Sequence, residues 1–300
     1  MLAIVTRVRD REEHLYASLP NWVAAAAVDE IVIVDYGSLK PINPSILELS
    51  NKIRLCTVRN APVWKSGKAI NIGVRLASAD LILRLDCDIN RVDNLAAYLD
   101  RKTEDHFLSG RMGDDVGFNG FFGQCIVSKR QWEAAGGYHE FMIGWGFDDS
   151  DFYARLVQKG FERQLFDIGD FGEISHSDAV RVAATMPCFD FIRKDVFLSK
   201  GFQLRLNQFI SKLVPWDGQL AEKITFEQLS PWRVEVHLSD EGAFERQIVR
   251  YAVLLCALSL KAPFGPEASP IGRLADVRLL KKLRWTDFLI QDLVRLPAMR

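Results

Sequence analysis

Apolar runs and amphipathic segments alternate along most of the chain. Four mostly apolar runs are typical of buried strands in a parallel sheet: residues 2–8, 31–34, 53–58 and 81–85. Helical patterns lie between these runs, the first from Asp10, a candidate helix cap, to about Ala27, and another from Lys65 onward. Strands and helices in regular alternation predict an α/β fold with parallel strands and right-handed crossovers.

The pattern continues beyond the fourth run and then changes. Two adjacent glycines follow one amphipathic segment, which marks the end of a helix. The expected elements are a strand over 121–127, a helix over 128–135, a helix over 148–157 and a strand over 161–168. After about Pro187 the pattern becomes mostly helical. We therefore expect an α/β domain over residues 1–187 and a helical C-terminal region over 188–300.

The composition is that of an ordinary globular protein. Of the 300 residues, 48% are hydrophobic and 26% are charged, and the formal net charge is −1. This balance gives no basic surface for nucleic acid, so no nucleic-acid partner is expected. The longest apolar stretch, residues 251–260, is shorter than the ~20 residues that a membrane-spanning helix needs. No basic segment precedes an apolar one at the start, so no secretory signal is expected.

The cysteines indicate the redox environment. The five of them are far apart and form neither a Cys-x-x-Cys pair nor a cluster with zinc-ligand spacing: Cys56, Cys87, Cys125, Cys188 and Cys256. Free thiols are typical of reducing compartments, so a cytoplasmic location is expected.

Two aspartates, Asp86 and Asp88, follow the fourth apolar run directly. In open α/β sheets, ligands bind beyond the carboxyl ends of the strands, where these side chains are expected. Two carboxylates one residue apart repel each other unless a cation compensates them, and a hard divalent ion with oxygen ligands is the natural compensation. For this motif alone, an Asp-rich turn without a ligand is the alternative.

Basic residues stand at two strand-to-helix junctions. Arg9 and Arg11 flank the first junction, where a helix N-terminus favours phosphate, although arginines in purely structural roles are common. Asp35 ends the second strand, in a position to accept from a ribose hydroxyl or a base. Lys68 lies at a helix start and is a weaker phosphate candidate. Its Gly-Lys pair lacks the first glycine of a P-loop at the required spacing, which excludes an ATPase of that kind.

A second informative stretch is Gly-Trp-Gly-Phe-Asp-Asp-Ser-Asp at residues 144–151. The glycines permit backbone shapes that other residues resist, so Trp145 between them is expected to be displayed rather than simply buried. The aspartates begin a helix, where the dipole favours negative charge. Ordinary helix capping explains one or two of these acids, but it does not explain the tryptophan in its glycine loop.

His176 follows the last predicted strand of the α/β domain. A lone histidine is more often a surface or hydrogen-bonded residue than a metal ligand, but a metal at Asp86 and Asp88 would need a further ligand. Glu173, three residues earlier, is an additional candidate.

The segment over residues 274–285 is basic and amphipathic. It is a candidate for peripheral contact with an anionic membrane surface, which for a cytoplasmic protein is the inner face of the membrane. A helix that packs on the core and exposes a solvated basic face is the alternative.

Together these motifs resemble the metal-dependent glycosyltransferases of the GT-A fold, in glycosyltransferase family 2 and its relatives. The Gly-Trp-Gly-x-Asp-Asp-x-Asp run is similar to the acceptor-site motif of the beta-1,4-galactosyltransferases, and polypeptide N-acetylgalactosaminyltransferases and chondroitin polymerases carry similar runs. The order of strand, Arg-x-Arg, Asp-x-Asp, acidic run and histidine also agrees. The resemblance covers about residues 1–187 and implies a GT-A fold with a mostly parallel sheet.

Carried over position by position, the resemblance implies three groups of site residues. The contacts to the nucleotide sugar are Val8, Arg9, Arg11, Asp35, Lys68 and Asp86. The metal ligands are Asp88 and His176. The catalytic base is Asp149, and the acceptor contacts are Trp145 and Asp148.

The implied activity is an inverting transfer of a hexose such as Gal, GalNAc, GlcNAc or Glc. The donor is a nucleotide diphosphate sugar of the UDP-sugar type, the acceptor is a hydroxyl of a glycan or glycolipid, and the cofactor is Mn²⁺ or Mg²⁺. This chain departs from the family at Phe147, where relatives have glycine, and at Phe121, where galactosyltransferases have a tyrosine near the donor sugar. The donor sugar is therefore not identified by the resemblance.

Two other functions are compatible with an acidic site on an α/β sheet. A nucleotidyltransferase would need a glycine-rich basic loop after the first strand, and this chain has Arg-Val-Arg-Asp-Arg there. A non-catalytic sugar-binding protein with the same fold is the other alternative. Slow donor hydrolysis with Mn²⁺ distinguishes a transferase from such a protein.

Overall fold

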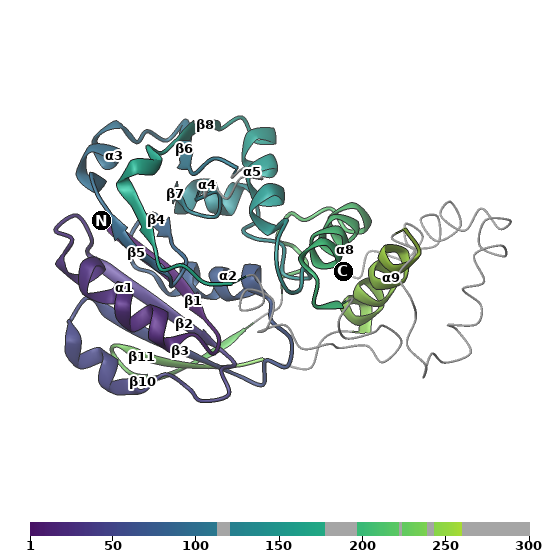
Figure 1. Ribbon diagram of the computed structural model, residues 1–300, viewed down its shortest axis with the longest axis horizontal. Coiled ribbons are helices and arrows are strands. Elements are labelled where there is room, and N and C mark those ends of the chain that lie inside the picture. Colours follow the sequence, from purple (N-terminus) through teal and green to yellow (C-terminus); the bar gives the residue numbers. More distant parts are fainter. Residues whose placement is uncertain (113–120, 178–196, 222–223, 239–242, 260–300) are drawn as a thin grey trace, which may run out of the picture.

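The computed structural model describes residues 1–112, 121–177, 197–221, 224–238 and 243–259. Within these residues a nine-stranded sheet has the order β10-β11-β3-β2-β1-β4-β7-β6-β8 (Figure 1). Its first four strands along the chain are parallel: β1 (Leu2–Val8), β2 (Glu30–Tyr36), β3 (Ile53–Arg59) and β4 (Leu81–Arg84). The antiparallel β7 (Cys125–Ser128) joins β4 to β6 (His106–Ser109), beside which β8 (Glu162–Leu165) runs parallel. The predicted α/β fold with a mostly parallel sheet is confirmed.

The central strands are buried on both faces, which explains why their sequences are mostly apolar. Successive side chains point to opposite faces, so Ile4 packs on one side and Val5 on the other. One face is covered by α1 (Glu12–Ala24), α3 (Leu95–Arg101) and the 3₁₀ helix η1 (Pro44–Leu49). The opposite face is covered by α2 (Ser66–Leu76) and α5 (Asp148–Gln158).

The first helix begins later and ends earlier than its sequence pattern predicts. Asp10 does not cap it: its backbone has a left-handed φ of +54°, and its carboxylate accepts from the Leu39 backbone N–H at 2.7 Å. The N-cap position belongs to Arg11, whose side chain makes no capping hydrogen bond. Asp10 therefore fastens the loop after β2 rather than the start of α1.

The middle of the chain contains two short strands that the pattern did not predict. These are β5 (Ile89–Val92) and β9 (Phe171–Glu173), which form a separate antiparallel pair. The η2 turn (Ile168–Asp170) leads into β9. Strands of three or four residues carry too few side chains to show a period, and that is why they and β6 escaped prediction.

Three predicted elements in this region differ in their bounds. The strand expected over 161–168 is the shorter β8, Glu162–Leu165. The strand expected over 121–127 begins only at Cys125, because Phe121–Gln124 is a turn closed by the Gln124 N–H and the Phe121 carbonyl at 2.9 Å. The helix expected over 128–135 is α4 (Lys129–Ala134), and Ser128 and Gln131 form a capping box at its start.

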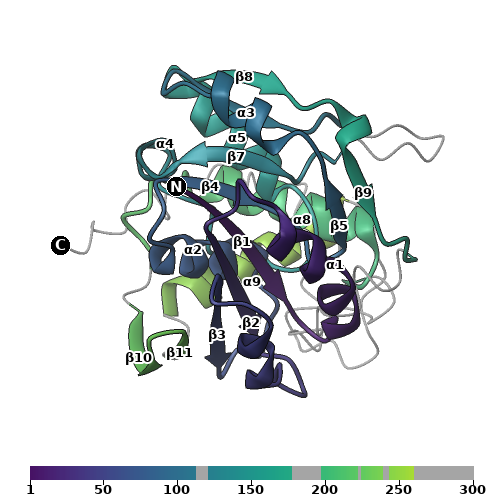
Figure 2. The same cartoon turned by 90° about the vertical axis from the view of Figure 1, so that its left-hand side faces the viewer.

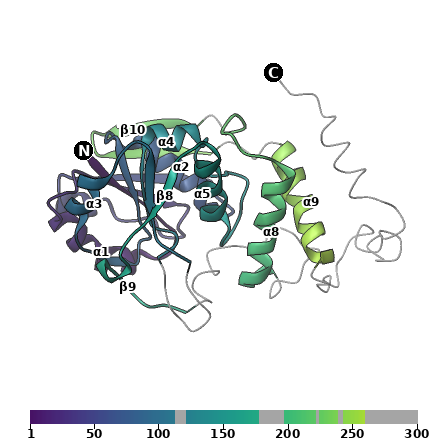
Figure 3. The same cartoon turned by 90° about the horizontal axis from the view of Figure 1, so that it is seen from above.

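The C-terminal region, expected to be helical, contains a β-hairpin as well as helices. In the hairpin, β10 (Thr225–Ser230) pairs with β11 (Arg233–His237), and β11 extends the main sheet beside β3, at the edge opposite β8 (Figure 2). The helices α8 (Lys200–Leu213) and α9 (Ala243–Ser259) lie side by side (Figure 3). Both pack on the apolar segment at residues 141–143. The expected boundary near residue 187 and the basic segment at 274–285 lie outside the described residues.

In the part of the chain that the structure describes, no helix combines the length and the apolar character that crossing a membrane requires.

Candidate functional site

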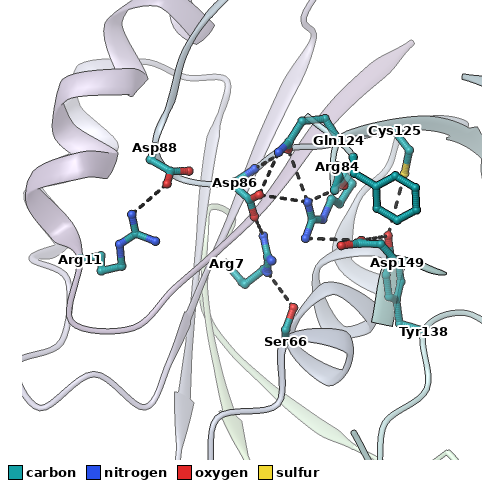
Figure 4. Close-up of polar contacts among 12 residues, drawn as sticks. Arg7, Arg11, Ser66, Arg84, Asp86, Asp88, Gln124, Cys125, Tyr138 and Asp149 are labelled. Atoms are coloured by element: carbon teal, nitrogen blue, oxygen red, sulfur yellow. Dashed lines mark hydrogen bonds and ion pairs between the residues drawn. The ribbon is translucent and has the colours of Figure 1, made fainter. Parts of the chain in front are cut away.

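The candidate site lies where β1 and β4 end (Figure 4). The two strands are parallel neighbours with Val5 opposite Arg84, so their carboxyl ends meet at one edge of the sheet. Asp86 and Asp88 follow β4 at this edge, as ligand-binding residues do in open α/β sheets. Asp149, from the start of α5, reaches the same place.

Asp88 and His176 are in direct contact although they are far apart in the sequence. The Nε2 atom of His176 lies 2.5 Å from Asp88 Oδ2, and Arg11 Nη2 donates to the same oxygen at 2.9 Å. The β5–β9 pair causes this approach, because the Ile174 N–H donates to the Asp88 carbonyl at 2.8 Å. The His14 ring packs edge-on against His176, with ring centroids 5.6 Å apart. The structure thus brings together both residues that the family resemblance assigned to the metal.

The donor set of Asp88 and His176 fits a divalent ion. A carboxylate oxygen and an imidazole nitrogen are both common ligands of Mn²⁺, and Mg²⁺ is often held by one or two carboxylates together with substrate phosphates. Among the described residues, no group of three His, Cys, Asp or Glu side chains is placed to hold a metal, so Glu173 does not join this pair. An ion here would take its remaining ligands from water and a diphosphate.

Asp86 is fixed in its charged form by a shell of donors. Arg7 Nη1 donates to Oδ1, while Arg84 Nη1 and Gln124 Nε2 lie 3.2 Å and 2.8 Å from Oδ2. Burial alone would raise the pKa of this carboxyl, but the charges of Arg7 and Arg84, with the Gln124 hydrogen bond, hold it well below its usual range. Asp86 is therefore an anion of fixed orientation, able to accept from a bound ligand.

Asp149 stands at the start of α5 in a different environment. Gly146 and Phe147 have left-handed φ values of +87° and +73°, which turn the chain sharply into the helix. The Tyr138 hydroxyl donates to Asp149 Oδ1 at 3.1 Å, and Arg84 Nη2 lies 3.6 Å from the same oxygen. Burial raises the pKa of Asp149 to about 7, against the opposing charge of Arg84. A carboxylate with this proton affinity suits general base catalysis near neutral pH.

The glycine–tryptophan loop before α5 is held by α8, from the C-terminal region. The Trp145 N–H donates to Gln203 Oε1 at 2.7 Å, and Asn207 Nδ2 donates to the Gly146 carbonyl at 2.7 Å. Gln203 and Asn207 are buried one helical turn apart, so both amides face the loop. The Trp145 ring is partly exposed, with the Lys200 ammonium 4.5 Å from its centroid. Asp148, the first residue of α5, is buried beside this loop.

Replacing Asn207 by Ala is expected to lower the free energy of unfolding by about 1–3 kcal/mol, because the Gly146 carbonyl and both polar backbone groups of Ile143 lose their partner. Urea unfolding followed by circular dichroism measures the difference. Arg205, exposed on the same helix, is the control, and Arg205→Ala should stay within about 0.5 kcal/mol of the wild type. Equal stability of the two variants would show that this hydrogen bonding is not important for the fold.

Four expected nucleotide contacts lie in other surroundings. Arg9 is buried and donates to the carbonyls of Ala61 and Pro62 at 3.1 Å and 3.4 Å. Asp35 is fully buried, and its carboxylate accepts from the backbone N–H groups of the loop that follows it. Val8 packs in the core on the α1 face, and Lys68 is buried within α2. Of the residues expected to contact the nucleotide sugar, Arg11 and Asp86 are the two that lie in the same site as Asp88 and Asp149.

Several residues of the site were not identified from the sequence. Arg7 and Arg84 interrupt apolar strands, and a charged residue in a buried strand needs a buried partner, so this signal was available. Gln124 and Tyr138 gave no such signal, because they reach the site only through the pairing of β7 with β4 and the stacking of Tyr138 on Phe152.

Comparisons with known proteins agree with this architecture. The family model described as the N-terminal domain of galactosyltransferase matches residues 112–177, which include Asp149 and His176. The catalytic domain of Drosophila beta1,4-galactosyltransferase 7, solved with xylobiose, has a TM-score of 0.52 at 16% identity. A mutant of that enzyme, solved with manganese, UDP-Gal and xylobiose, has a TM-score of 0.51 at 16% identity. Both alignments cover 83% of this chain and 98% of the other.

A third solved structure, residues 1–349 of TarS from S. aureus, has a TM-score of 0.47 at 13% identity, covering 57% of this chain and 59% of that one. No curated protein sequence matches the chain. The fold is that of the GT-A glycosyltransferases, as predicted, and the galactosyltransferase family model supports a transferase.

Proposed function

We propose that the protein is an inverting, metal-dependent glycosyltransferase that moves a hexose from a nucleotide diphosphate sugar to a hydroxyl of a glycan or glycolipid. The observation that supports this most is the meeting of two acidic centres at one sheet edge: Asp88 with His176, and Asp149 beside Asp86. The Asp88–His176 pair is suited to bind a diphosphate through a metal ion, and Asp149 is suited to act as the general base. The Drosophila enzyme of the same fold was solved with manganese, UDP-Gal and xylobiose, so a UDP-sugar and a glycan are the first candidates for donor and acceptor.

On the donor side, Asp88 and His176 would hold Mn²⁺ or Mg²⁺. The ion supplies positive charge that offsets the charge developing on the departing diphosphate. Arg11, which already contacts Asp88, adds a guanidinium that can bind phosphate oxygens. Asp86 borders the ribose or the donor sugar as a hydrogen-bond acceptor.

On the acceptor side, Asp149 takes the proton of the acceptor hydroxyl as that oxygen attacks the anomeric carbon. The new C–O bond forms on the face opposite the diphosphate, and the old C–O bond breaks with its electron pair leaving on the diphosphate. A single displacement of this kind inverts the anomeric configuration. Trp145 provides an apolar surface for the acceptor ring, and Asp148 accepts from its hydroxyl groups.

The experiment that tests this function is nucleotide release. Full-length protein is incubated with individual UDP-, GDP- and dTDP-sugars, with Mn²⁺ or EDTA, and the free nucleoside diphosphate is measured. A glycosyltransferase is expected to release it slowly from one donor class, with Mn²⁺ only. A nucleotidyltransferase would instead release pyrophosphate from a nucleoside triphosphate and a sugar phosphate, and a non-catalytic protein would release nothing from any donor.

The rate of transfer is expected to fall on the acidic side of a midpoint near pH 7. The pKa of Asp149 is raised to about 7, so the base is protonated below that pH and ionised above it. Well below the midpoint, kcat/KM should decrease about tenfold per pH unit. A pH profile of kcat/KM measures this. A midpoint near pH 4, the ordinary range of an aspartate, would show that the pKa of the base is not raised in the way that the burial of Asp149 predicts.

We also propose that the protein is cytoplasmic. The four described cysteines, Cys56, Cys87, Cys125 and Cys256, are all buried and free, in keeping with a reducing environment. Contact of residues 274–285 with the inner face of the membrane is also kept as a proposal, to be tested by co-sedimentation with anionic liposomes.

A further inference from the structure

Arg84 is a charged residue at a position where a strand normally carries an apolar one. It is the last residue of β4, its side chain is only 2% exposed, and the residues before it in the strand are Leu81, Ile82 and Leu83. A buried guanidinium is costly unless acceptors surround it. The identity of those acceptors therefore indicates what this side chain does.

The Arg84 guanidinium lies between the two carboxylates of the site (Figure 4). Its Nη1 atom is 3.2 Å from Asp86 Oδ2, and its Nη2 atom is 3.6 Å from Asp149 Oδ1. Nη1 also donates to the Gly123 carbonyl and lies 3.4 Å from Gln124 Oε1. Two different nitrogens of one planar guanidinium thus contact Asp86, which faces the nucleotide sugar in the proposed function, and Asp149, which faces the sugar acceptor.

The backbone beside Arg84 is shaped for this arrangement. A Cβ atom on Gly123 would collide with Arg84 Nη1 and would lie 3.2 Å from Asp149 Oδ2. A side chain at position 123 would therefore displace the Arg84 guanidinium from its place between the two carboxylates. Asp86 is held from the other side by Arg7, so Arg84 is not needed to neutralise it and has a nitrogen available for Asp149.

We propose that Arg84 is a positioning residue that couples the two halves of the site. Its guanidinium holds Asp149 in place and stabilises the charged form of Asp149, and it divides its positive charge between Asp149 and Asp86. The inference rests on the proposed function only in naming Asp149 as the base. In this arrangement the negative charges of Asp86 and Asp149 compete for the same guanidinium, so Asp86 limits how strongly Arg84 stabilises the charged form of Asp149.

The groups around Asp149 make Arg84 the decisive charge. Asp148 on α5 and Asp86 after β4 are anions that raise the pKa of Asp149. Among the described residues, the cation with the next largest effect is Arg7 on β1, which lowers this pKa less than Arg84 does. The neighbouring Tyr138, Tyr153 and Cys125 are neutral near pH 7, because burial raises the pKa of each. Without Arg84, burial would keep Asp149 protonated at neutral pH.

The test measures the proton affinity of Asp149 directly and needs no substrate. Full-length protein is labelled with ¹³C at the aspartate side-chain carboxyl carbons, and the resonance missing from Asp149→Asn identifies Asp149. In the wild type it is expected to titrate near pH 7. Arg84→Gln should raise the Asp149 midpoint by about one pH unit or more, the usual effect of losing a cation at this distance. Arg84→Lys keeps the positive charge, so its midpoint should lie close to the wild-type value.

A second variant keeps the inference testable if Arg84→Gln does not fold. Asp86→Asn leaves Arg84 in place but removes its competing anion, so the Asp149 midpoint should move down. Arg75 on α2, which pairs with Glu140, is the control for loss of an arginine elsewhere, and Arg75→Gln should leave the midpoint unchanged. An Asp149 midpoint that stays at the wild-type value in Asp86→Asn, or in folded Arg84→Gln, would overturn the inference.

These results are independent of whether the protein transfers sugar. A shifted midpoint in a protein that releases no nucleotide from any donor would support the coupling and remove the proposed function. An unshifted midpoint in an active transferase would remove only the coupling. In an active transferase, the acid limb of kcat/KM for Arg84→Gln should move to higher pH by the same interval as the carboxyl resonance, which a merely structural role would not produce.

Discussion

Asp149→Asn is expected to lower sugar transfer by on the order of 10²–10⁴-fold, the usual contribution of one positioned base. The amide keeps the shape of the side chain and can still accept from the Tyr138 hydroxyl, but it cannot take a proton from the acceptor. Donor binding should survive, because the Asp88–His176 pair is a separate part of the site. Transfer is measured by acceptor glycosylation, and donor binding by calorimetry with UDP and Mn²⁺.

Two further variants make this result specific. Glu133 is an exposed carboxylate on α4, so Glu133→Gln makes the same chemical change away from the site and should transfer at the wild-type rate. Asp148→Asn should weaken acceptor binding more than donor binding, raising the KM for the acceptor. If Asp149→Asn transfers sugar to its acceptor at close to the wild-type rate, the inverting mechanism proposed here is incorrect.

The parallel strands β1 to β4 could be predicted because they are buried on both faces. Such strands have no polar face, and mostly apolar runs marked them directly. The hairpin of β10 and β11 could not be predicted in this way. All but the last residue of β10 are exposed, and an edge strand of this kind carries no apolar pattern to distinguish it from a loop.

The candidate site was predictable to the extent that its residues follow a strand or begin a helix. Asp88 was identified for that reason. Asp149, at a helix start, and His176, in the expected order along the chain, were assigned their roles by the family resemblance. Arg9 and Asp35 have the same sequence setting, but their side chains satisfy backbone groups of neighbouring loops. A strand end predicts where a side chain lies along the sheet edge, whereas its rotamer and partners depend on loops whose course the sequence pattern does not reveal.

Asp88→Ala is expected to abolish the metal dependence of nucleotide binding. Asp88 is one of only two protein groups that converge on the expected ion among the described residues, the other being His176. Loss of a residue that merely orients a ligand typically costs 10–100-fold in metal affinity, so loss of a ligand should cost at least about 100-fold. Calorimetry with UDP, with and without Mn²⁺, measures this, and His176→Ala should behave similarly.

Asp93→Ala is the matched control, because Asp93 is a half-exposed carboxylate shortly after Asp88 that pairs with Arg91 away from the site. It should bind UDP with the wild-type Mn²⁺ dependence. UDP binding by Asp88→Ala in the absence of metal then distinguishes loss of a metal-coordinating side chain from loss of the folded structure. In Asp88→Ala, Arg11 loses its anionic partner and becomes available to phosphate oxygens, so UDP binding in EDTA should be at least as strong as in the wild type. Wild-type metal dependence in folded Asp88→Ala would contradict the metal assignment, and equal losses with and without Mn²⁺ would indicate instead that Asp88 supports the fold.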